Sequence, residues 1–435
     1  MLEQLKAYIE EQHLLPRKGQ RVLLAVSGGR DSVCMANLMH EAGYPFAIAH
    51  CNFHLRPGDC DRDQQFVGDL SDRLGVVFHT TNFDTHAFAA ANHMSAEEAA
   101  RHLRYDFFAD LCRAHGYYAV VTAHHRDDSI ETLFLNLFRG TGIAGLHGIR
   151  PVSELVIKNE ALRIIRPLLP FSRADIDAYV RDNHLEYVED VTNGELSARR
   201  NRIRLVLMPL LRQLYPSVDL TLQADIERFA DAEQLYNDRI EDLRMQLVHA
   251  VPPRVPTMPG GLQEICLANI PEPRHTVLFE LLRPYGVGDA TVRRLLTGDI
   301  ATGKCFSTDM HDIVYSRGRL VVGRRLEAVA PVLEETEEPF VPGSEGIYVD
   351  ADRLVRPLTL RLWHQGDRIH PFGSNYARKV SDVLKDMKIN RIEKKHVWVL
   401  ADADGRIVWL VGLMADNRFR VDDSTHRVLH ISLKA

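Results

Sequence analysis

A serine-glycine turn lies between a largely apolar segment and a segment with helical spacing near the start of the chain. The apolar segment covers residues 21–26 and contains β-branched side chains. The turn that follows it consists of Ser27, Gly28, Gly29, Arg30, Asp31 and Ser32. Glycines lack a Cβ and can take positive φ, so backbone N–H groups can close on an anion there, and the two serines add hydroxyl donors. The helix expected after the turn directs the positive end of its dipole at the same point, so the pattern predicts a phosphate-binding loop.

Asp31 is an acidic side chain inside this predicted anion site. A carboxylate repels phosphate unless a cation lies between them, and Mg²⁺ prefers oxygen ligands from carboxylates and phosphates. We therefore expect Asp31 to bind a magnesium ion that accompanies a pyrophosphate group. A serine-glycine turn can also be purely structural, but the strand before it, the helix after it and the Asp-Ser ending favour a functional interpretation.

A second group of chemically active side chains lies within residues 122–132. It contains two histidines, two aspartates and a glutamate, namely His124, His125, Asp127, Asp128 and Glu131. On a helix that starts near Asp127, Glu131 shares a face with the aspartates beside the end of the preceding strand. Carboxylates gathered in this way favour a cation or a basic substrate. An acidic first turn that caps the helix is the structural alternative.

The surrounding sequence alternates between short apolar segments and longer amphipathic ones. Strands are expected over residues 21–26, 46–51, 76–81 and 118–123. Helices are expected over residues 32–42, 62–74, 95–115 and 128–138. This alternation predicts an α/β fold with a doubly wound parallel sheet, in which ligands lie beyond the carboxyl ends of the strands. The turn at Ser27 and residues 49–50 and 123–125 follow strand ends, so we expect three loops to meet in one crevice.

The composition limits the class of protein. The chain has 435 residues, of which 45% are hydrophobic and 26% charged, and its formal net charge is −6. This length suggests about three domains of a soluble globular protein. The N-terminus is charged where a secretory signal would be apolar, and no apolar run reaches the roughly 18 residues of a membrane span, so a cytoplasmic enzyme without membrane contact is expected. Six cysteines without a CxxC pair indicate reduced thiols, and the negative charge argues against wholesale coating of nucleic acid but allows local basic patches.

The serine-glycine turn resembles the SGGxDS pyrophosphate loop of the ATP-pyrophosphatase family. Within that family, the order and spacing of several further motifs resemble the tRNA(Ile)-lysidine synthetases. The matching segments are His50–Arg56, Ser95–Tyr105, residues 124–132, Arg139–Leu146, Arg166–Leu169 and Arg199–Arg204. One departure is Ser129, where the family usually has glutamine. No role is therefore assigned to that side chain.

The resemblance implies a fold of the PP-loop nucleotide α-hydrolase type and an ATP-dependent ligation. ATP and Mg²⁺ would adenylate the C2 oxygen of the wobble cytidine in the CAU anticodon of tRNA(Ile), and the amine of free L-lysine would then displace AMP to give lysidine. A carbonyl oxygen becomes a leaving group only once it is a phosphate ester, and a cationic lysine fits a pocket lined with carboxylates. Either Asp127 or Asp128 is expected to hold the lysine ammonium and assist its deprotonation. Adenine is expected near Ala25.

Arg199, Arg200, Arg202 and Arg204 form the densest positive cluster, on a helix expected to run toward Pro209. Such a charge run can be a solvated face, but the resemblance favours Arg204 as the group that offsets charge on the α-phosphate as pyrophosphate departs.

Further residues are expected to bind the substrates. The resemblance points to His125 and Glu131 in the acidic group, and Arg139 is available to a phosphate. The glycines after Arg139 spell GxGxxG, but they follow a predicted helix instead of a strand, so we reject a dinucleotide fold. Glu97 and Arg101 either line the substrate crevice or form an ordinary surface pair at i,i+4 spacing.

A short segment rich in histidine and cysteine allows two interpretations. It contains His50, Cys51, His54 and Cys60, which are all metal-ligand types. Their irregular spacing and the expected burial of Cys51 favour packing, with His50 and His54 contacting RNA, over a zinc site.

The remaining sequence predicts two further domains. We expect a catalytic domain over residues 1–215, a small helical tRNA-contacting domain over 216–304 and a β-rich tRNA-binding domain over 305–435. Residues 217–249 read as one long helix, and the glutamate-rich stretch 333–338 is expected to be a linker.

Positive charge gathers in the last expected domain, around a GDR turn that resembles the C-terminal module of the longer lysidine synthetases. Such patches bind the phosphate backbone without reading bases. The basic residues include Arg368, Arg378, Lys379, Lys394 and Lys395, and a solvated surface is the alternative for Lys394 and Lys395.

Two other functions remain open, and so does the assembly. A tRNA sulfurtransferase of the same loop family would also adenylate a base, but the missing CxxC counts against it. A noncatalytic RNA-binding protein would need neither the glycine turn nor the acidic helix. A homodimer is one assembly open to such an enzyme.

Overall fold

The computed structural model describes residues 1–15, 19–54, 59–189, 199–298, 300–374 and 376–434, and the side chains of residues 59 and 60 lie outside the description. The chain forms two compact units, Met1–Leu235 and Tyr236–Ala435. The boundary falls inside α10, Val218–Leu247, which is the long helix expected from the sequence. In the described ranges, no helix is both long enough and apolar enough to cross a membrane.

The first unit is built on a six-stranded sheet in the order β3-β2-β1-β4-β6-β5. The four expected parallel strands are confirmed, and a hairpin adds two more, with only β5 antiparallel to its neighbour. The strands are β1 Val22–Ala25, β2 Phe46–Asn52, β3 Val77–Asn82, β4 Val120–Val121, β5 Val152–Ile157 and β6 Glu160–Ile165. The α/β fold class predicted from the alternating pattern is therefore correct.

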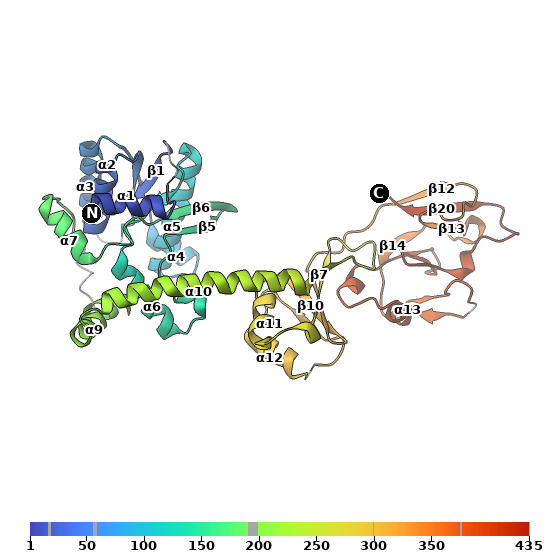
Figure 1. Cartoon of the computed structure of the whole chain (residues 1–435). Helices are drawn as coiled ribbons and strands as arrows, with labels where there is room; N and C mark the ends of the chain where they lie inside the picture. Colours follow the sequence, from blue (N-terminus) through green and yellow to red (C-terminus); the bar gives the residue numbers. More distant parts are fainter. Residues whose placement is uncertain (16–18, 55–58, 190–198, 299, 375, 435) are drawn as a thin grey trace. The chain divides into compact units, whose positions relative to one another are not determined.

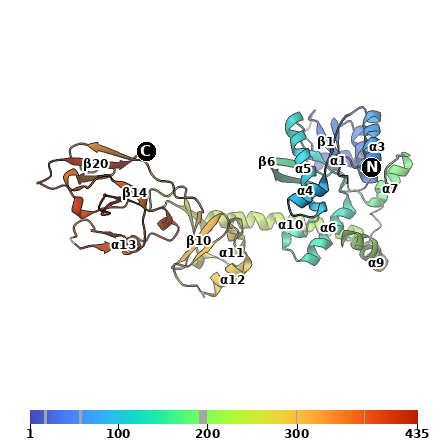
Figure 2. The same ribbon diagram turned by 180° about the vertical axis from the view of Figure 1, so that it is seen from behind.

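Helices cover both faces of this sheet (Figures 1 and 2). Successive strand residues point to opposite faces, so Leu24 joins a core with α1, α2, α3 and α7, while Leu23 joins a second core with α5. The helices are α1 Leu2–Glu11, α2 Arg30–Glu41, α3 Asp59–Leu74, α4 Thr85–Ala91, α5 Ala96–His115, α6 Arg126–Arg139 and α7 Arg173–Asp182.

The arginine-rich helix expected to run toward Pro209 is interrupted. It consists of α8 Arg199–Arg202, a π-helical segment η3 Ile203–Leu207 and α9 Met208–Leu214. Pro209 lacks the N–H that would bond to the carbonyl of Leu205, and its ring would crowd that carbonyl in an α-helix, so a wider turn precedes it. Segments of this kind often occur at functional sites.

The second unit begins with an antiparallel sheet in the order β7-β8-β11-β10-β9, packed against α11 and α12. These elements are β7 Val248–Val251, β8 Leu262–Cys266, α11 Arg274–Leu282, α12 Asp289–Thr297, β9 Cys305–Ser307, β10 His311–Ser316 and β11 Arg319–Arg324. The sheet thus contains strands from both sides of residue 304, where the sequence placed a domain boundary.

The last part of the chain is rich in strands, as predicted. They are β12 Leu333–Glu337, β13 Ile347–Asp350, β14 Thr359–Leu362, β15 Arg368–Ile369, β16 Arg378–Lys379, β17 Trp398–Ala401, β18 Ile407–Leu410, β19 Met414–Ala415 and β20 Val428–Leu433, with one helix, α13 Val380–Asp386. The linker expected at 333–338 is wrong, because β12 pairs with β20 along its whole length. Glutamates on an exposed edge strand discourage pairing with other chains, which explains a strand of this composition.

Candidate active site

The serine-glycine turn joins β1 to α2 and forms a closed loop. Gly28 has φ of +93°, a backbone conformation that residues with a Cβ rarely adopt, so a side chain there would be strained. The Gly29 N–H donates to Ser27 Oγ over 3.3 Å, and Ser32 Oγ donates to the Gly29 carbonyl over 2.8 Å. These bonds hold the loop at the N-terminus of α2, where backbone N–H groups and the helix dipole favour an anion.

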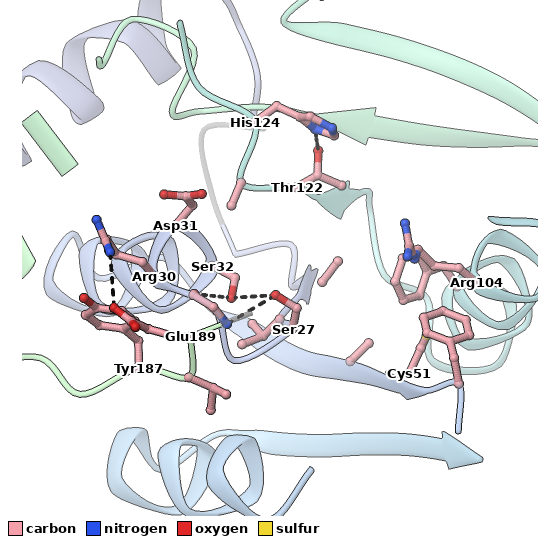
Figure 3. A pocket seen from close by; sticks show the side chains of 18 of the residues that line it. Ser27, Arg30, Asp31, Ser32, Cys51, Arg104, Thr122, His124, Tyr187 and Glu189 are labelled. Carbon is pink, nitrogen blue, oxygen red and sulfur yellow. Dashed lines mark hydrogen bonds and ion pairs between the residues drawn. The ribbon is translucent and has the colours of Figure 1, made fainter. Parts of the chain in front are cut away.

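A pocket of about 660 Å³ opens above this loop (Figure 3). It lies at the carboxyl ends of β1, β2 and β4, as expected for a sheet of this kind. Five residues of the turn line it, namely Ser27, Gly29, Arg30, Asp31 and Ser32. An apolar side formed by the other strand ends and by α5 includes Ala25, Ala49, Phe53, Tyr105 and Phe108. The pocket therefore offers anion donors at one end and flat apolar surface at the other.

Asp31 is paired with an arginine from a distant part of the chain. Both carboxylate oxygens lie 3.0 Å from Nη1 of Arg173, and Nε2 of His125 lies 3.8 Å from the same carboxylate. Burial raises the pKa of Asp31, and the neighbouring positive charges only partly offset that effect. Arg173 is the first residue of α7 and has no motif around it, so the sequence did not identify it.

The two aspartates at the start of α6 have different partners. Asp127 accepts hydrogen bonds from the backbone N–H of Arg173 and from Nη2 of Arg212, each over 2.9 Å. Asp128 accepts from the backbone N–H of His125 over 3.0 Å and so contributes to capping the helix. Burial alone would raise the pKa of Asp128, but His125 and Arg200 outweigh it and hold that pKa below its ordinary value.

Glu131 is buried and is held by two arginines. Its Oε2 accepts from Nε of Arg200 and its Oε1 from Nε of Arg204, each over 2.7 Å, and its side chain is only 2% exposed. Burial lowers the pKa of Arg204, but the bond to Glu131 more than compensates and the net direction is upward. Glu131 therefore orients the two guanidinium groups.

A second pocket of about 220 Å³ lies beside the first. Its lining consists of His125, Asp127, Ile130, Glu131, Arg173, Arg204, Met208 and Arg212. Arg173 and Arg204 line both pockets, so the two cavities meet at these guanidinium groups. The second pocket contains carboxylates as well as arginines and can accept a ligand that carries both charges.

His124, the first residue of the group at 124–132, is neutral at physiological pH. Nδ1 of His124 lies 2.9 Å from Oγ1 of Thr122, and both side chains line the larger pocket (Figure 3). Burial lowers the pKa of His124 to about 4, although the nearby Asp128 acts in the opposite direction. A neutral imidazole can donate or accept a hydrogen bond without adding charge.

Two predicted substrate residues in or just after β2 lie outside both pockets. His50 is buried, and its Nδ1 lies 2.9 Å from the carbonyl of Val26, the residue before the serine-glycine turn. His54 is exposed, and its backbone N–H donates to Asn52 Oδ1. Neither is among the described residues that line the two pockets. His50 therefore contacts the backbone just before the serine-glycine turn and does not face the substrate.

Three other predicted residues also lie away from these pockets. Glu97 and Arg101 are exposed on α5, with the Arg101 guanidinium 4.9 Å from the ring centroid of Tyr105. Arg139 lies at the end of α6 and lines a third cavity. Arg104, one turn after Arg101 on α5, does line the larger pocket. It lies inside the matched segment 95–105, and that signal could have identified it as a pocket residue.

The larger pocket suits a magnesium ion held by one carboxylate better than a metal held by several protein ligands. Among the side chains that the structure describes, no group of three histidines, cysteines or carboxylates could hold a metal. Mg²⁺ is commonly bound by one carboxylate together with substrate phosphates, and Asp31 beside the serine hydroxyls suits that arrangement. Cys60, part of the zinc alternative, lies outside the described side chains.

Comparison with known proteins gives consistent matches over the whole chain. Residues 2–211 match the PP-loop domain family, and residues 358–432 match the TilS substrate C-terminal domain family. The chain is 37% identical to a tRNA(Ile)-lysidine synthase of Parabacteroides distasonis, with 99% of both chains covered, and 37% identical to one of Bacteroides thetaiotaomicron, with 97% of both covered. A U34-tRNA thiolase from Methanococcus maripaludis superposes with a TM-score of 0.43 at 15% identity, over 53% of this chain and 79% of that one.

Proposed function

This chain belongs to the tRNA(Ile)-lysidine synthase family and forms lysidine on tRNA(Ile), and on that premise we propose which residues perform each step. The larger pocket holds ATP and the cytidine to be modified, and the smaller pocket holds L-lysine. This assignment rests on one observation, which is that Arg173 and Arg204 line both pockets. A group activated in one pocket is therefore next to an amine bound in the other.

The phosphates of ATP bind at the N-terminus of α2. Backbone N–H groups of the loop and the hydroxyls of Ser27 and Ser32 bind the β and γ phosphates. Asp31 would hold a bound Mg²⁺, which would neutralise part of the pyrophosphate charge. The adenine packs at the apolar end of the pocket, near Ala25 and Ala49.

The first chemical step transfers AMP to the base. The C2 oxygen of cytosine forms a bond to the α-phosphorus, the bond between the α-phosphorus and the bridging oxygen breaks, and pyrophosphate leaves with that electron pair. Arg204 lines the pocket at this point and is oriented by Glu131, so its guanidinium offsets charge that develops on the α-phosphate. His124, which is neutral, can hydrogen-bond the base without opposing that charge.

The second step uses lysine from the smaller pocket. Free lysine carries an ammonium group and an α-carboxylate, which match Asp127 and Arg212 in the lining. Asp127 is favoured over Asp128 for this role because only Asp127 is among the described lining residues. The amine must lose a proton before it attacks C2, and Asp127 is positioned to receive it as AMP departs with the C2 oxygen.

The second unit binds the body of the tRNA. Lys379 and Lys385 are exposed on β16 and α13, within the segment that matches the TilS substrate C-terminal domain. Arg378 is also exposed, but it is bonded to Asp386. Burial lowers the pKa of Lys394, and the nearby Arg391 and Lys385 lower it further. Lys395 is bonded to Asp312 over 2.5 Å and is less available to phosphate.

The products of ATP distinguish this function from its alternatives. The purified chain, ATP, L-lysine and a tRNA(Ile) transcript with a CAU anticodon are mixed, and AMP, ADP and pyrophosphate are quantified with each component omitted in turn. We expect one AMP and one pyrophosphate for each lysine incorporated. Sulfur incorporation would indicate a thiolase, no ATP turnover would indicate a binding protein, and ADP would contradict the proposed chemistry.

A further inference from the structure

A third pocket lies on the outer side of α6 and α8, apart from the two that hold the reaction. Its volume is about 300 Å³, and its lining consists of Leu135, Phe138, Arg139, Arg199, Arg202, Ile203 and Leu207. Of these residues, none lines either of the other pockets. The lining combines apolar surface with three guanidinium groups and contains no carboxylate among the residues described.

The arginine-rich segment divides its side chains between two sides. Arg200 and Arg204 point inward to Glu131, whereas Arg199 and Arg202 line the outer pocket. Among the residues that the structure describes, Arg139 and Arg199 form no ion pair, and both line this pocket. Unpaired cations on a concave surface favour an anionic ligand.

The aromatic side chain in this pocket is exposed without an evident folding reason. Phe138 is 66% exposed, although it stacks on Phe134 with ring centroids 5.7 Å apart. Phe138 is the last residue but one of α6, and of the two rings it is the one that lines the pocket. Phenylalanine rings and arginine guanidinium planes are the surfaces on which proteins stack unpaired RNA bases.

The outer pocket is close to the reaction centre along the chain. Ile203 lines it, while the next residue, Arg204, lines both inner pockets. Along α6, Phe138 follows Glu131 by seven residues, which is about 10 Å at the rise of an α-helix. An RNA strand that places one base in the inner pocket can therefore reach the outer pocket with a neighbouring nucleotide.

We propose that the outer pocket binds one unpaired nucleotide of the anticodon loop that flanks the modified cytidine, with its base stacked on Phe138 and its phosphates beside Arg139 and Arg199. This rests on the proposed function for the identity of the RNA. The site positions the loop so that the cytidine enters the larger pocket, and it recognises a base by its flat face and its anionic backbone. An apolar peptide would leave Arg139 and Arg199 without counter-ions, and an inorganic anion would not use the aromatic face.

Binding of RNA with single missing bases tests this site directly. Dissociation constants are measured at fixed salt for intact tRNA(Ile) and for transcripts that each carry one abasic nucleotide in the anticodon loop. With the wild-type chain, we expect one flanking position to cost about tenfold in affinity, within the range of one stacked base. In Phe138→Ala, intact tRNA binds about tenfold more weakly, and the same abasic position costs nothing further.

The phosphate contact has its own readout. In Arg139→Gln, we expect the slope of log affinity against log salt to become shallower by about 0.7, the value for one phosphate on a single strand. Two matched variants serve as controls. Leu137→Ala removes an apolar side chain that is 51% exposed on the same helix and does not line the pocket, and Arg181→Gln removes an exposed arginine from α7. Both should bind RNA as the wild type does.

The outcomes separate this proposal from the proposed function. If no abasic position is coupled to Phe138, or if Leu137→Ala weakens RNA binding as much as Phe138→Ala, the nucleotide site is refuted. If Phe138→Ala changes only the molecular mass in solution, the pocket is an interface between copies of the chain and the proposal is also refuted. Failure of the wild type to form lysidine would overturn the proposed function alone, because the coupling is measured by binding.

Discussion

The loops that follow β1 and β4 form opposite walls of the same active site, yet they are built differently. The loop after β1 relies on backbone N–H groups and hydroxyls that are neighbours in sequence, and Gly28 and Ser32 shape it locally. The start of α6 after β4 relies on carboxylates whose arginine partners come from far along the chain, as Glu131 shows with Arg200 and Arg204. An anion site can thus be encoded within a few residues, whereas a cluster of buried charges depends on the whole fold.

The difference has an energetic basis. Backbone donors at a helix N-terminus are present whenever the helix forms, so the loop is prepared before any ligand arrives. A buried carboxylate is costly unless charged partners surround it, and Glu131 is nearly inaccessible to water. We therefore expect substitutions in the first loop to affect chemistry and substitutions in the second to affect stability as well.

The largest expected effect is on chemistry at the β1 loop. Asp31→Asn should slow pyrophosphate release about a thousandfold, because it removes the charge that pairs with Mg²⁺ on the departing group. Single-turnover release with saturating tRNA and lysine measures it. Asp182→Asn, an exposed acid on α7, is the matched control and should release pyrophosphate at the wild-type rate. If Asp31→Asn slowed pyrophosphate release less than tenfold, the role assigned to Asp31 in holding Mg²⁺ would be wrong.

The next effect is on stability at the start of α6. Glu131→Gln leaves two arginines facing a neutral amide, and breaking a buried pair of this kind costs about 3 kcal/mol in the free energy of unfolding. Urea denaturation followed by circular dichroism measures that energy. Substituting Asp182 in the same way affects only a surface pair with Arg181 and should cost under about 1 kcal/mol. If the two substitutions lowered the free energy of unfolding equally, the proposed difference between buried and exposed carboxylates would be wrong.

The two arginines on Glu131 provide a comparison within a single cluster. Arg204 lines both inner pockets, and Arg200 is not among the described residues that line either. Arg204→Gln should therefore lower kcat for pyrophosphate release about a hundredfold, while Arg200→Gln should lower it much less. Arg204→Gln removes two bonds to Glu131, and Arg200→Gln removes one bond to Glu131 and two to the Asp128 carbonyl and the Thr132 hydroxyl, so both variants should lose stability. Equal losses of kcat would mean that Arg204 acts only through the fold.

The smallest expected effect is a pH dependence at His124. Its pKa is about 4 in the folded chain and about 6.5 when unfolded, so the unfolded chain binds the proton more readily. The neutral His124 side chain therefore makes its full contribution to the free energy of unfolding above pH 6.5, and that contribution is lost as the pH falls toward 4. Between about pH 7 and pH 5.5 the free energy of unfolding should fall by about 1 kcal/mol. His124→Gln should remove this part of the decrease, and an unchanged pH profile would contradict it.

Local patterns were sufficient for the frame of the active site. The strand, glycine turn and helix around Ser27 were predicted because each depends on its own residues, and the order of parallel strands followed from alternation. The acidic group at residues 124–132 was recognised as a cluster for the same reason. The capping bond of Asp128 also matches the structural alternative considered for that segment.

Contacts between distant segments were not predictable in the same way. Arg173 and Arg212 have no motif of their own, and only folding brings them to Asp31 and Asp127. The strand β12 was taken for a linker because edge strands tolerate charge that a central strand does not. The outer pocket was not predicted, because the arginines of residues 199–204 form one cluster in the sequence and only the helical geometry divides them between two sides.

The mass of the wobble nucleoside tests the central claim most directly. After the reaction, tRNA(Ile) is digested to nucleosides, and the nucleoside from the first anticodon position is analysed by mass spectrometry. We expect a cytidine that is heavier by one lysine residue, only when ATP and L-lysine are both present, and never with Asp31→Asn at comparable times. An unmodified cytidine or a sulfur-bearing base under complete conditions would contradict the account.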